Sequence, residues 1–185
     1  MNAAELIRFF GKPSYSPFGE TRADQVVRSL RLAGLVPVGG RGPSAVKIEA
    51  LHAAHVLLGL NSATAADAST AALAWGNIRP RERLPSPFGK CNTLLEFLEH
   101  ALSGASQADS IESVLINIDW PEAVARFRKS KREVTFGDSE TSRRIGFRTY
   151  PIRRLCSFSG SIFSQLVLEL ERPEKKAHQL RKLVD

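Results

Sequence analysis

Hydrophobic residues recur at helical spacing through the first hundred residues of the chain. Between residues 21 and 33 the apolar side chains fall on one face of a helix: Ala23, Val26, Val27, Leu30 and Ala33. The same kind of spacing predicts helices over residues 3–10, 21–33, 48–60, 64–78 and 93–102. Residues 48–60 are apolar on nearly every side, which indicates a helix buried in the core.

Beyond residue 110 the pattern is typical of short β-strands. Val114, Ile116 and Ile118 alternate with side chains on the opposite face, which predicts a strand over residues 111–120. Further strands are predicted over residues 123–127, 133–136 and 144–150. Ser157 or Ser159 is then expected to cap a final helix that continues through Leu170.

The helix predicted over residues 21–33 carries a polar face opposite its apolar one. Thr21 is a favourable N-cap residue, and Gly34 is a favourable stop. The opposite face carries Asp24, Gln25, Arg28, Arg31 and Leu32, with Arg22 and Ser29 on its flanks. Arginine, glutamine and serine are residues that contact base edges and phosphates in DNA.

A basic, glycine-rich loop follows this helix between two short extended runs. The runs are residues 35–38 and 45–48, and the loop is residues 39–44. Helix, strand, loop and strand are the layout of a winged helix-turn-helix, in which the helix enters the major groove. The alternative interpretation is a solvated helix, self-paired through Asp24 and Arg28, followed by an ordinary hairpin turn.

The segment VVRSLRLAGLVPVGGRG, residues 26–42, resembles the recognition helix and wing of winged-helix DNA-binding proteins. It is most similar to those of phage and mobile-element regulators and of phage DNA-packaging small subunits. The resemblance covers about a third of the chain, and it implies base contacts from the exposed face of the second helix. It also implies a backbone contact from Arg41. The proline-containing segment 11–20 departs from a compact three-helix motif.

These patterns predict an α+β fold. An N-terminal winged helix-turn-helix with added helices would precede a small antiparallel sheet and a C-terminal helix. Residues 79–87 contain three prolines and cannot form one helix, and the small, polar residues 103–110 predict a linker. The expected divisions are a winged helix-turn-helix in 1–60, a helical extension or linker in 61–104, and a β-rich module in 105–185.

The charge of the chain favours an anionic partner. Its 26 Lys and Arg against 19 Asp and Glu give a net charge of +7. Residues 1–60 hold seven basic and four acidic side chains, residues 61–120 four and seven, and residues 121–185 fifteen and eight. Two basic ends therefore surround an acidic middle, and nucleic acid is the first candidate partner, ahead of an acidic membrane surface.

The C-terminal cations allow two interpretations. Ten of them lie close together in the sequence: Arg126, Arg128, Lys129, Lys131, Arg132, Arg143, Arg144, Arg148, Arg153 and Arg154. The aromatic residues among them are Phe127, Phe136, Phe147 and Tyr150. Either these rings and charges form a surface for a phosphate backbone or single strand, or the rings face the core and the charges are solvated. A protein partner for this module is an equal alternative.

No motif in the sequence indicates catalysis, a metal or a cofactor. His52 and His55 are spaced to share a metal, but no acidic or cysteine partner stands nearby, so core histidines are expected. Cys91 and Cys156 are too few for a disulfide scaffold or zinc ribbon. No phosphate-binding loop or nucleophile elbow is found. Without a signal peptide or membrane span, the expected setting is the cytoplasm, with no membrane partner.

The sequence therefore predicts a sequence-specific, double-stranded DNA-binding protein rather than an enzyme, and we expect a homo-oligomeric transcriptional regulator. Gln25, Arg28 and Ser29 would read bases. Four cations would contact phosphates: Arg22, Arg31, Arg41 and Lys47. The alternatives are the DNA-recognition small subunit of a phage packaging (terminase) motor and a protein-binding adaptor on the same fold.

Overall fold

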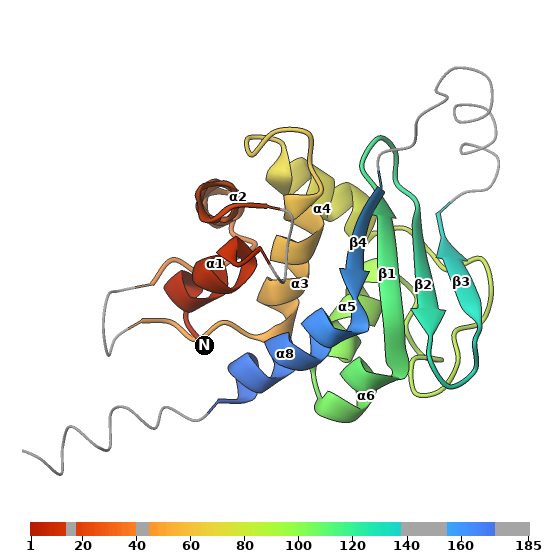
Figure 1. The fold of residues 1–185 in the computed structure, drawn as a ribbon. Coiled ribbons are helices and arrows are strands. Elements are labelled where there is room, and N and C mark those ends of the chain that lie inside the picture. Colours follow the sequence, from red (N-terminus) through yellow and green to blue (C-terminus); the bar gives the residue numbers. More distant parts are fainter. Residues whose placement is uncertain (14–17, 40–44, 138–154, 173–185) are drawn as a thin grey trace, which may run out of the picture.

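The computed structural model describes residues 1–13, 18–39, 45–137 and 155–172. Helices occupy its first part: α1 (Ala3–Gly11), α2 (Glu20–Leu32), α3 (Ala50–Leu60), α4 (Ala68–Gly76), α5 (Leu94–Leu102) and α6 (Ala105–Ser110). They are followed by β1 (Ile111–Asn117), β2 (Ala123–Phe127), β3 (Glu133–Phe136), β4 (Leu155–Ser159) and α8 (Gly160–Glu171). Figure 1 shows the N-terminal helices at one end of the molecule and the sheet at the other. The predicted α+β class is confirmed.

Two of the described helices, α1 and α5, begin where a polar side chain accepts a hydrogen bond from a free backbone N–H group. Asn2 caps α1 by accepting from the Glu5 N–H at 3.0 Å, and the Glu5 carboxylate accepts from the Asn2 N–H at 2.8 Å. Thr93 caps α5, with its hydroxyl accepting from the Glu96 N–H at 3.2 Å. Helix α2 differs from the prediction because Gly19, rather than Thr21, is its N-cap residue. Starting there places the acidic Glu20 in the first turn, where the helix dipole favours it.

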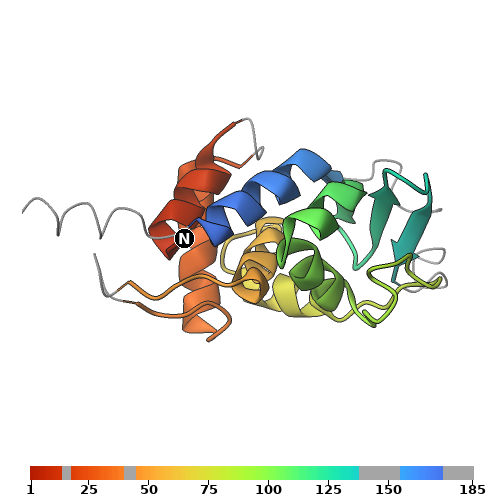
Figure 2. The ribbon, with the colours of Figure 1, turned by 90° about the horizontal axis from the view of Figure 1, so that it is seen from below.

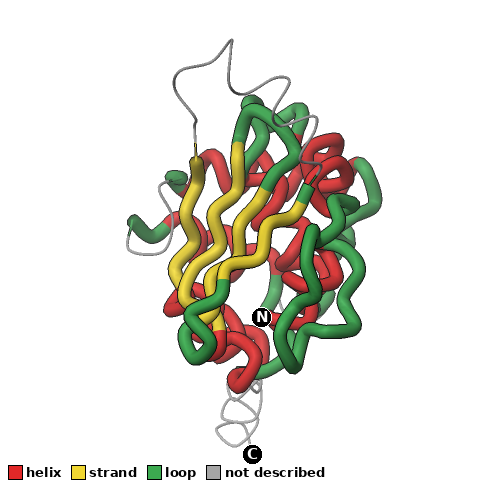
Figure 3. Tube along the Cα trace, turned by 90° about the vertical axis from the view of Figure 1, so that its right-hand side faces the viewer, coloured by secondary structure: helices red, strands yellow, loops and turns green. Residues whose placement is uncertain are grey.

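The sheet is antiparallel with strand order β3-β2-β1-β4, and one of its faces packs on helices. Val114 of β1 lies opposite Ala125 of β2 and Phe158 of β4, and all three side chains are buried. Figure 3 shows the other face, with the helices behind the strands. The strand β4 is absent from the prediction, which assigns its residues to the approach to a helix. Ser159 is nevertheless the N-cap residue of α8, one of the two predicted.

One continuous cluster of buried side chains extends from α1 to α8. Aromatic rings connect the helices to the sheet within it. Phe97 of α5 lies 4.9 Å from Phe88 and 5.4 Å from Phe136 of β3, measured between ring centroids. Figure 2 shows α8 lying along the molecule between α1 and the sheet. The predicted segments 1–60, 61–104 and 105–185 therefore all contribute side chains to the same core.

The predicted wing is not formed as a β-hairpin in the part that the structure describes. Neither residues 35–38 nor residues 45–48 form a strand, although Gly39 approaches Val46 closely. Pro37 has no N–H to donate to a ladder, and the Ile48 N–H donates to the Met1 carbonyl at 2.9 Å. A winged helix-turn-helix is therefore not confirmed. Residues 40–44 and the strand predicted over residues 144–150 lie outside the described residues.

The prediction of a linker over residues 103–110 is wrong for most of that segment. Residues Ala105–Ser110 form the short helix α6, with Ala108 fully buried. Small residues are compatible with a linker, but here they allow α6 to pack closely against α8. The helix predicted over residues 64–78 is α4, which is shorter and covers Ala68–Gly76. It begins later because Thr64 and Asp67 bond to each other in a turn.

Candidate nucleic-acid interface

One side of α2 is exposed along its whole length. Thr21, Gln25, Arg28 and Leu32 follow one another at helical spacing and are all exposed; we call them the α2 stripe. Arg28 is 73% exposed and Leu32 is 92% exposed. The opposite side is buried against α1 and α3. The amphipathic pattern of the sequence therefore places the stripe in solvent, as predicted for this face.

The close packing of α2 on α3 fixes the direction in which the stripe points. Gly59 of α3 lies directly beneath α2. A Cβ atom added at Gly59 would be 3.1 Å from Cγ1 of Val26 and 3.3 Å from Cδ1 of Leu30. Contacts of this length are tighter than ordinary van der Waals contact, so a larger residue at Gly59 would require Val26 and Leu30 to shift by a few tenths of an ångström.

Two of the predicted DNA-contacting residues instead attach α2 to the loop between α3 and α4. The guanidinium of Arg22 donates to the Ser62 carbonyl at 2.6 Å and to the Ser62 hydroxyl at 3.0 Å. The hydroxyl of Ser29 donates to the Ala66 carbonyl at 3.3 Å. Both side chains are half-buried. We therefore assign Arg22 and Ser29 a structural role.

Arg31 and Arg28 have intramolecular partners of different character. Nε of Arg31 donates to the Pro37 carbonyl at 3.3 Å and ties the end of α2 to the segment after it. Arg28 forms an ion pair of 2.7 Å with Asp24, one helical turn away. Such exposed pairs contribute roughly 0.2–1 kcal/mol, so a nucleic acid can displace Asp24 at little cost.

Gln25 and Lys47 are exposed, and their side chains make no bond or ion pair within the described ranges. Lys47 lies in residues 45–48, which lead into α3, whereas Gln25 is in the middle of the α2 stripe. Arg41 lies outside the described residues. Of the seven residues that the sequence proposes, the structure therefore leaves Gln25, Arg28 and Lys47 accessible to a partner.

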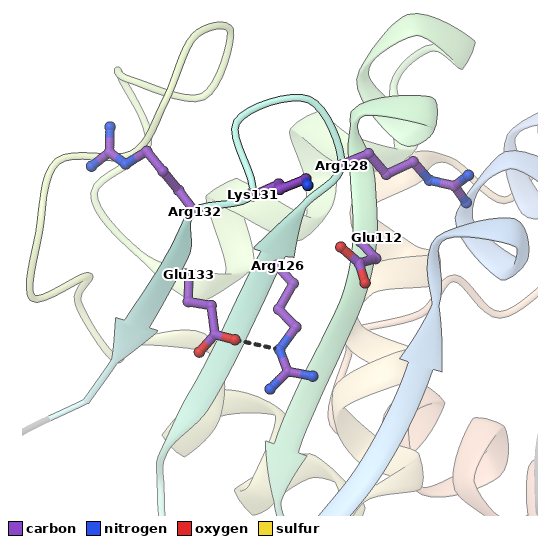
Figure 4. A pocket seen from close by; sticks show the side chains of 6 residues that line it. All are labelled: Glu112, Arg126, Arg128, Lys131, Arg132 and Glu133. Carbon is purple, nitrogen blue, oxygen red and sulfur yellow. Dashed lines mark ion pairs between the residues drawn. The ribbon is translucent and has the colours of Figure 1, made fainter.

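A second group of cations lies at and beside the turn between β2 and β3. The sequence predicted only part of this group. Arg126, Arg128, Lys131 and Arg132 line a shallow depression of 490 Å³ together with Glu112 and Glu133 (Figure 4). Arg132 also donates to the Arg83 carbonyl at 3.2 Å, across 49 positions of sequence. No sequence pattern pairs these two segments. The juxtaposition comes from the fold.

The aromatic residues of this region face inward. Phe127 is 3% exposed and Phe136 is fully buried. For these two rings the interpretation as core residues is confirmed. Phe147 and Tyr150 lie outside the described residues.

The histidines and cysteines belong to the packing of the helices. Nδ1 of His52 accepts from the Glu49 N–H at 3.1 Å at the start of α3, and His55 is buried. Burial, with a smaller contribution from His52, lowers the pKa of His55 below its ordinary value. Burial raises the pKa of the Cys156 thiol to about 12. Among the described residues, no three His, Cys, Asp or Glu side chains gather as metal ligands would.

Comparison with known proteins returned nothing: no family model, curated protein or solved structure matches this chain. None of the helices in the described part of the chain has the length and apolar character that a membrane span requires. The functional argument therefore depends on the geometry of the two surfaces described above.

Proposed function

We propose that this chain is a double-stranded DNA-binding protein that places the α2 stripe in the major groove. The observation that carries the proposal is the unobstructed exposure of Gln25 and Arg28 on one side of a 13-residue helix. At 1.5 Å per residue, α2 is about 20 Å long. The major groove of B-DNA is wide enough to admit an α-helix.

The two central side chains of the stripe suit base recognition. Arginine forms paired hydrogen bonds with guanine, and glutamine does so with adenine. Arg28 and Gln25 lie three positions apart and point to the same side of α2, so they address neighbouring base pairs. The ion pair with Asp24 keeps the Arg28 side chain along the helix surface until a base replaces the carboxylate.

The remaining predicted residues have two roles: some orient α2 within the protein, and others would contact the DNA phosphates. Arg22, Ser29 and Arg31 hold α2 to its neighbours and thereby orient the stripe. Lys47, exposed in the segment between α2 and α3, would contact phosphates, and Arg41 would have the same role. Side chains already bonded to the fold provide orientation, which reduces the ordering cost of binding.

We further propose that the protein acts as a homo-oligomeric regulator of transcription. Exposed apolar side chains in the segment between α2 and α3 support self-association: Val38 and Val46. A dimer would place two α2 stripes on neighbouring turns of the duplex. Mass measurement in solution separates the classes, because a dimer supports the regulator and a ring of many subunits supports the packaging subunit.

The experiment that tests this function is selection of bound duplexes from a random pool. We expect enrichment of a short motif, with two-fold symmetry if the protein is a dimer. The variant Gln25→Ala/Arg28→Ala should lose that enrichment, and Arg8→Gln/Arg172→Gln, which alters two exposed cations elsewhere, should retain it. A wild-type protein that enriches no motif would contradict sequence-specific binding.

A further inference from the structure

The turn between β2 and β3 concentrates positive charge because of strand alternation. Ala125 and Phe127 of β2 point into the core, so Arg126 and Arg128 point outward. The exposed turn itself contributes Lys129, Lys131 and Arg132. Five cations thus occur within seven residues at one end of the sheet.

The segment with three arginines at residues 79–83 runs beside the same hairpin. The Arg81 N–H donates to the Thr135 carbonyl at 2.8 Å, and the Gly137 N–H donates to the Arg79 carbonyl at 2.9 Å. These bonds extend the sheet beyond β3. The bond from Arg132 to the Arg83 carbonyl then joins this segment to the turn. Cations from an acidic part of the sequence are thereby added to the basic hairpin.

Most of these cations are not neutralised by the fold. Arg126 pairs with Glu133 at 2.7 Å, and Arg81 pairs with Glu122 at 3.1 Å. Six other exposed cations make no ion pair within the described ranges, and together they define the hairpin surface: Arg79, Arg83, Arg128, Lys129, Lys131 and Arg132. Concentrated like charges of this kind attract polyanions.

Arg128 is held in place at this surface. Its Nε donates to the Ile111 carbonyl at 2.9 Å, and its guanidinium lies beside Gly160, the first residue of α8. The N-terminal end of a helix carries a partial positive charge, which adds to the field of the cations. The two depressions, lined respectively by the turn and by residues 79–84, are open and shallow, so they fit an extended polyanion better than an enclosed small ligand.

We propose that the hairpin surface binds the phosphate backbone of duplex DNA without sequence preference. Single-strand binding needs exposed rings on which bases stack, and the aromatic residues of β2 and β3, Phe127 and Phe136, are buried. Exposed lysines and arginines on an open turn suit phosphates. The partner, duplex DNA, is taken from the proposed function, on which this inference rests.

The hairpin surface and the α2 stripe lie at opposite ends of the molecule (Figures 1 and 2). One protein can therefore contact two duplex segments, or two parts of a bent one. Because the surfaces share no residue, variants can remove them separately.

The test measures binding to a labelled random-sequence duplex of 30 base pairs over a series of salt concentrations. Lys129→Gln/Lys131→Gln should reduce the magnitude of the negative slope of log affinity against log salt by about 1.8, since each phosphate contact contributes roughly 0.9. Adding Arg83→Gln should lower it by roughly 0.9 more. Arg8→Gln/Arg172→Gln, with the same loss of charge elsewhere, should leave the slope unchanged. Circular dichroism confirms that each variant is folded.

The outcomes separate this inference from the proposed function. An unchanged slope in the hairpin variants would overturn the hairpin surface and leave α2 standing. If the magnitude of the salt slope falls in the hairpin variants but not in Gln25→Ala/Arg28→Ala, on this probe and on selected duplexes, the α2 proposal alone is overturned. Tighter binding of a 30-nucleotide single strand, or of an acidic polypeptide, would overturn the choice of duplex. No binding of wild type to duplex at 50 mM salt would overturn both proposals.

Discussion

The guanidinium of Arg22 on α2 donates to the backbone carbonyl of Ser62 at 2.6 Å, across 40 positions of sequence. The same group donates to the Ser62 hydroxyl, whose one proton has two acceptors within reach, the Gly59 carbonyl at 2.7 Å and the Thr64 carbonyl at 2.6 Å. Arg22 therefore closes a network that joins α2 to the end of α3. A residue that looks like a phosphate contact in the sequence works inside the protein to orient the helix.

Replacing Arg22 should mainly affect stability. Arg22→Ala leaves the Ser62 carbonyl without its charged donor, and hydrogen bonds to charged groups contribute about 1.5–3 kcal/mol. Because Arg22 is only half-buried, we expect a loss near the lower end of that range in the free energy of unfolding, measured with urea. Unchanged stability together with a salt slope smaller in magnitude by about 0.9 would instead make Arg22 a phosphate contact.

The ion pair between Asp24 and Arg28 predicts opposite effects of two single substitutions on DNA affinity. Arg28→Ala should weaken binding to a selected duplex by about 1–3 kcal/mol. Asp24→Asn releases Arg28 and removes a negative charge near the phosphates, so it should tighten binding. Both changes should shift stability by less than about 1 kcal/mol, because the pair is exposed. Weaker binding by Asp24→Asn would show that Asp24, rather than Arg28, contacts the DNA.

Two glycine substitutions test the packing of α2 on α3. Gly59→Ala places a methyl group 3.1 Å from Val26 and should lower the melting temperature, with a cost of about 1–3 kcal/mol for overpacking. Gly76→Ala in α4 is the matched control, because its nearest neighbour would be at an ordinary 3.4 Å. The control should be neutral or stabilise by up to about 1 kcal/mol through helix propensity. Equal melting temperatures for the two variants would contradict the close approach.

The buried His55 predicts loss of stability in mild acid. Its pKa in the folded protein lies below the ordinary value of 6.5, because burial and His52 disfavour the charged form. The unfolded chain therefore binds the proton first, and unfolding becomes easier as the pH falls below about 6.5. Urea unfolding from pH 7.5 to 5.5 should show this decline. His55→Gln should reduce the dependence on pH whatever its absolute stability, and an unaltered dependence would assign it to other groups.

Local patterns predict much of the fold because their physical causes are local. The apolar residues of α3 are visible in the sequence, and the bounds of β2 and β3 agree with the prediction. Strand β4 was not predicted because its five residues alternate only briefly before the cap of α8. Its pairing with β1, more than thirty residues away, provides the stabilisation.

In the candidate site, too, the features set by local sequence could be predicted and those set by tertiary packing could not. Helical periodicity is sufficient to predict that Gln25 and Arg28 are exposed. It cannot predict that Arg22 and Ser29 bond to Ser62 and Ala66, because those partners arrive only when α3 and α4 pack. The hairpin surface depends likewise on a contact between Arg132 and Arg83 that no local pattern encodes.

The central claim, that the α2 stripe binds duplex DNA, is tested most directly by fluorescence anisotropy with a duplex obtained by selection. Wild type and Arg8→Gln/Arg172→Gln should bind it with equal affinity. Gln25→Ala/Arg28→Ala should bind it at least tenfold more weakly, as the loss of about 1.4 kcal/mol or more requires, while its affinity for a random duplex changes less. Equal affinities of the wild type and the stripe variant for the selected duplex would contradict the claim.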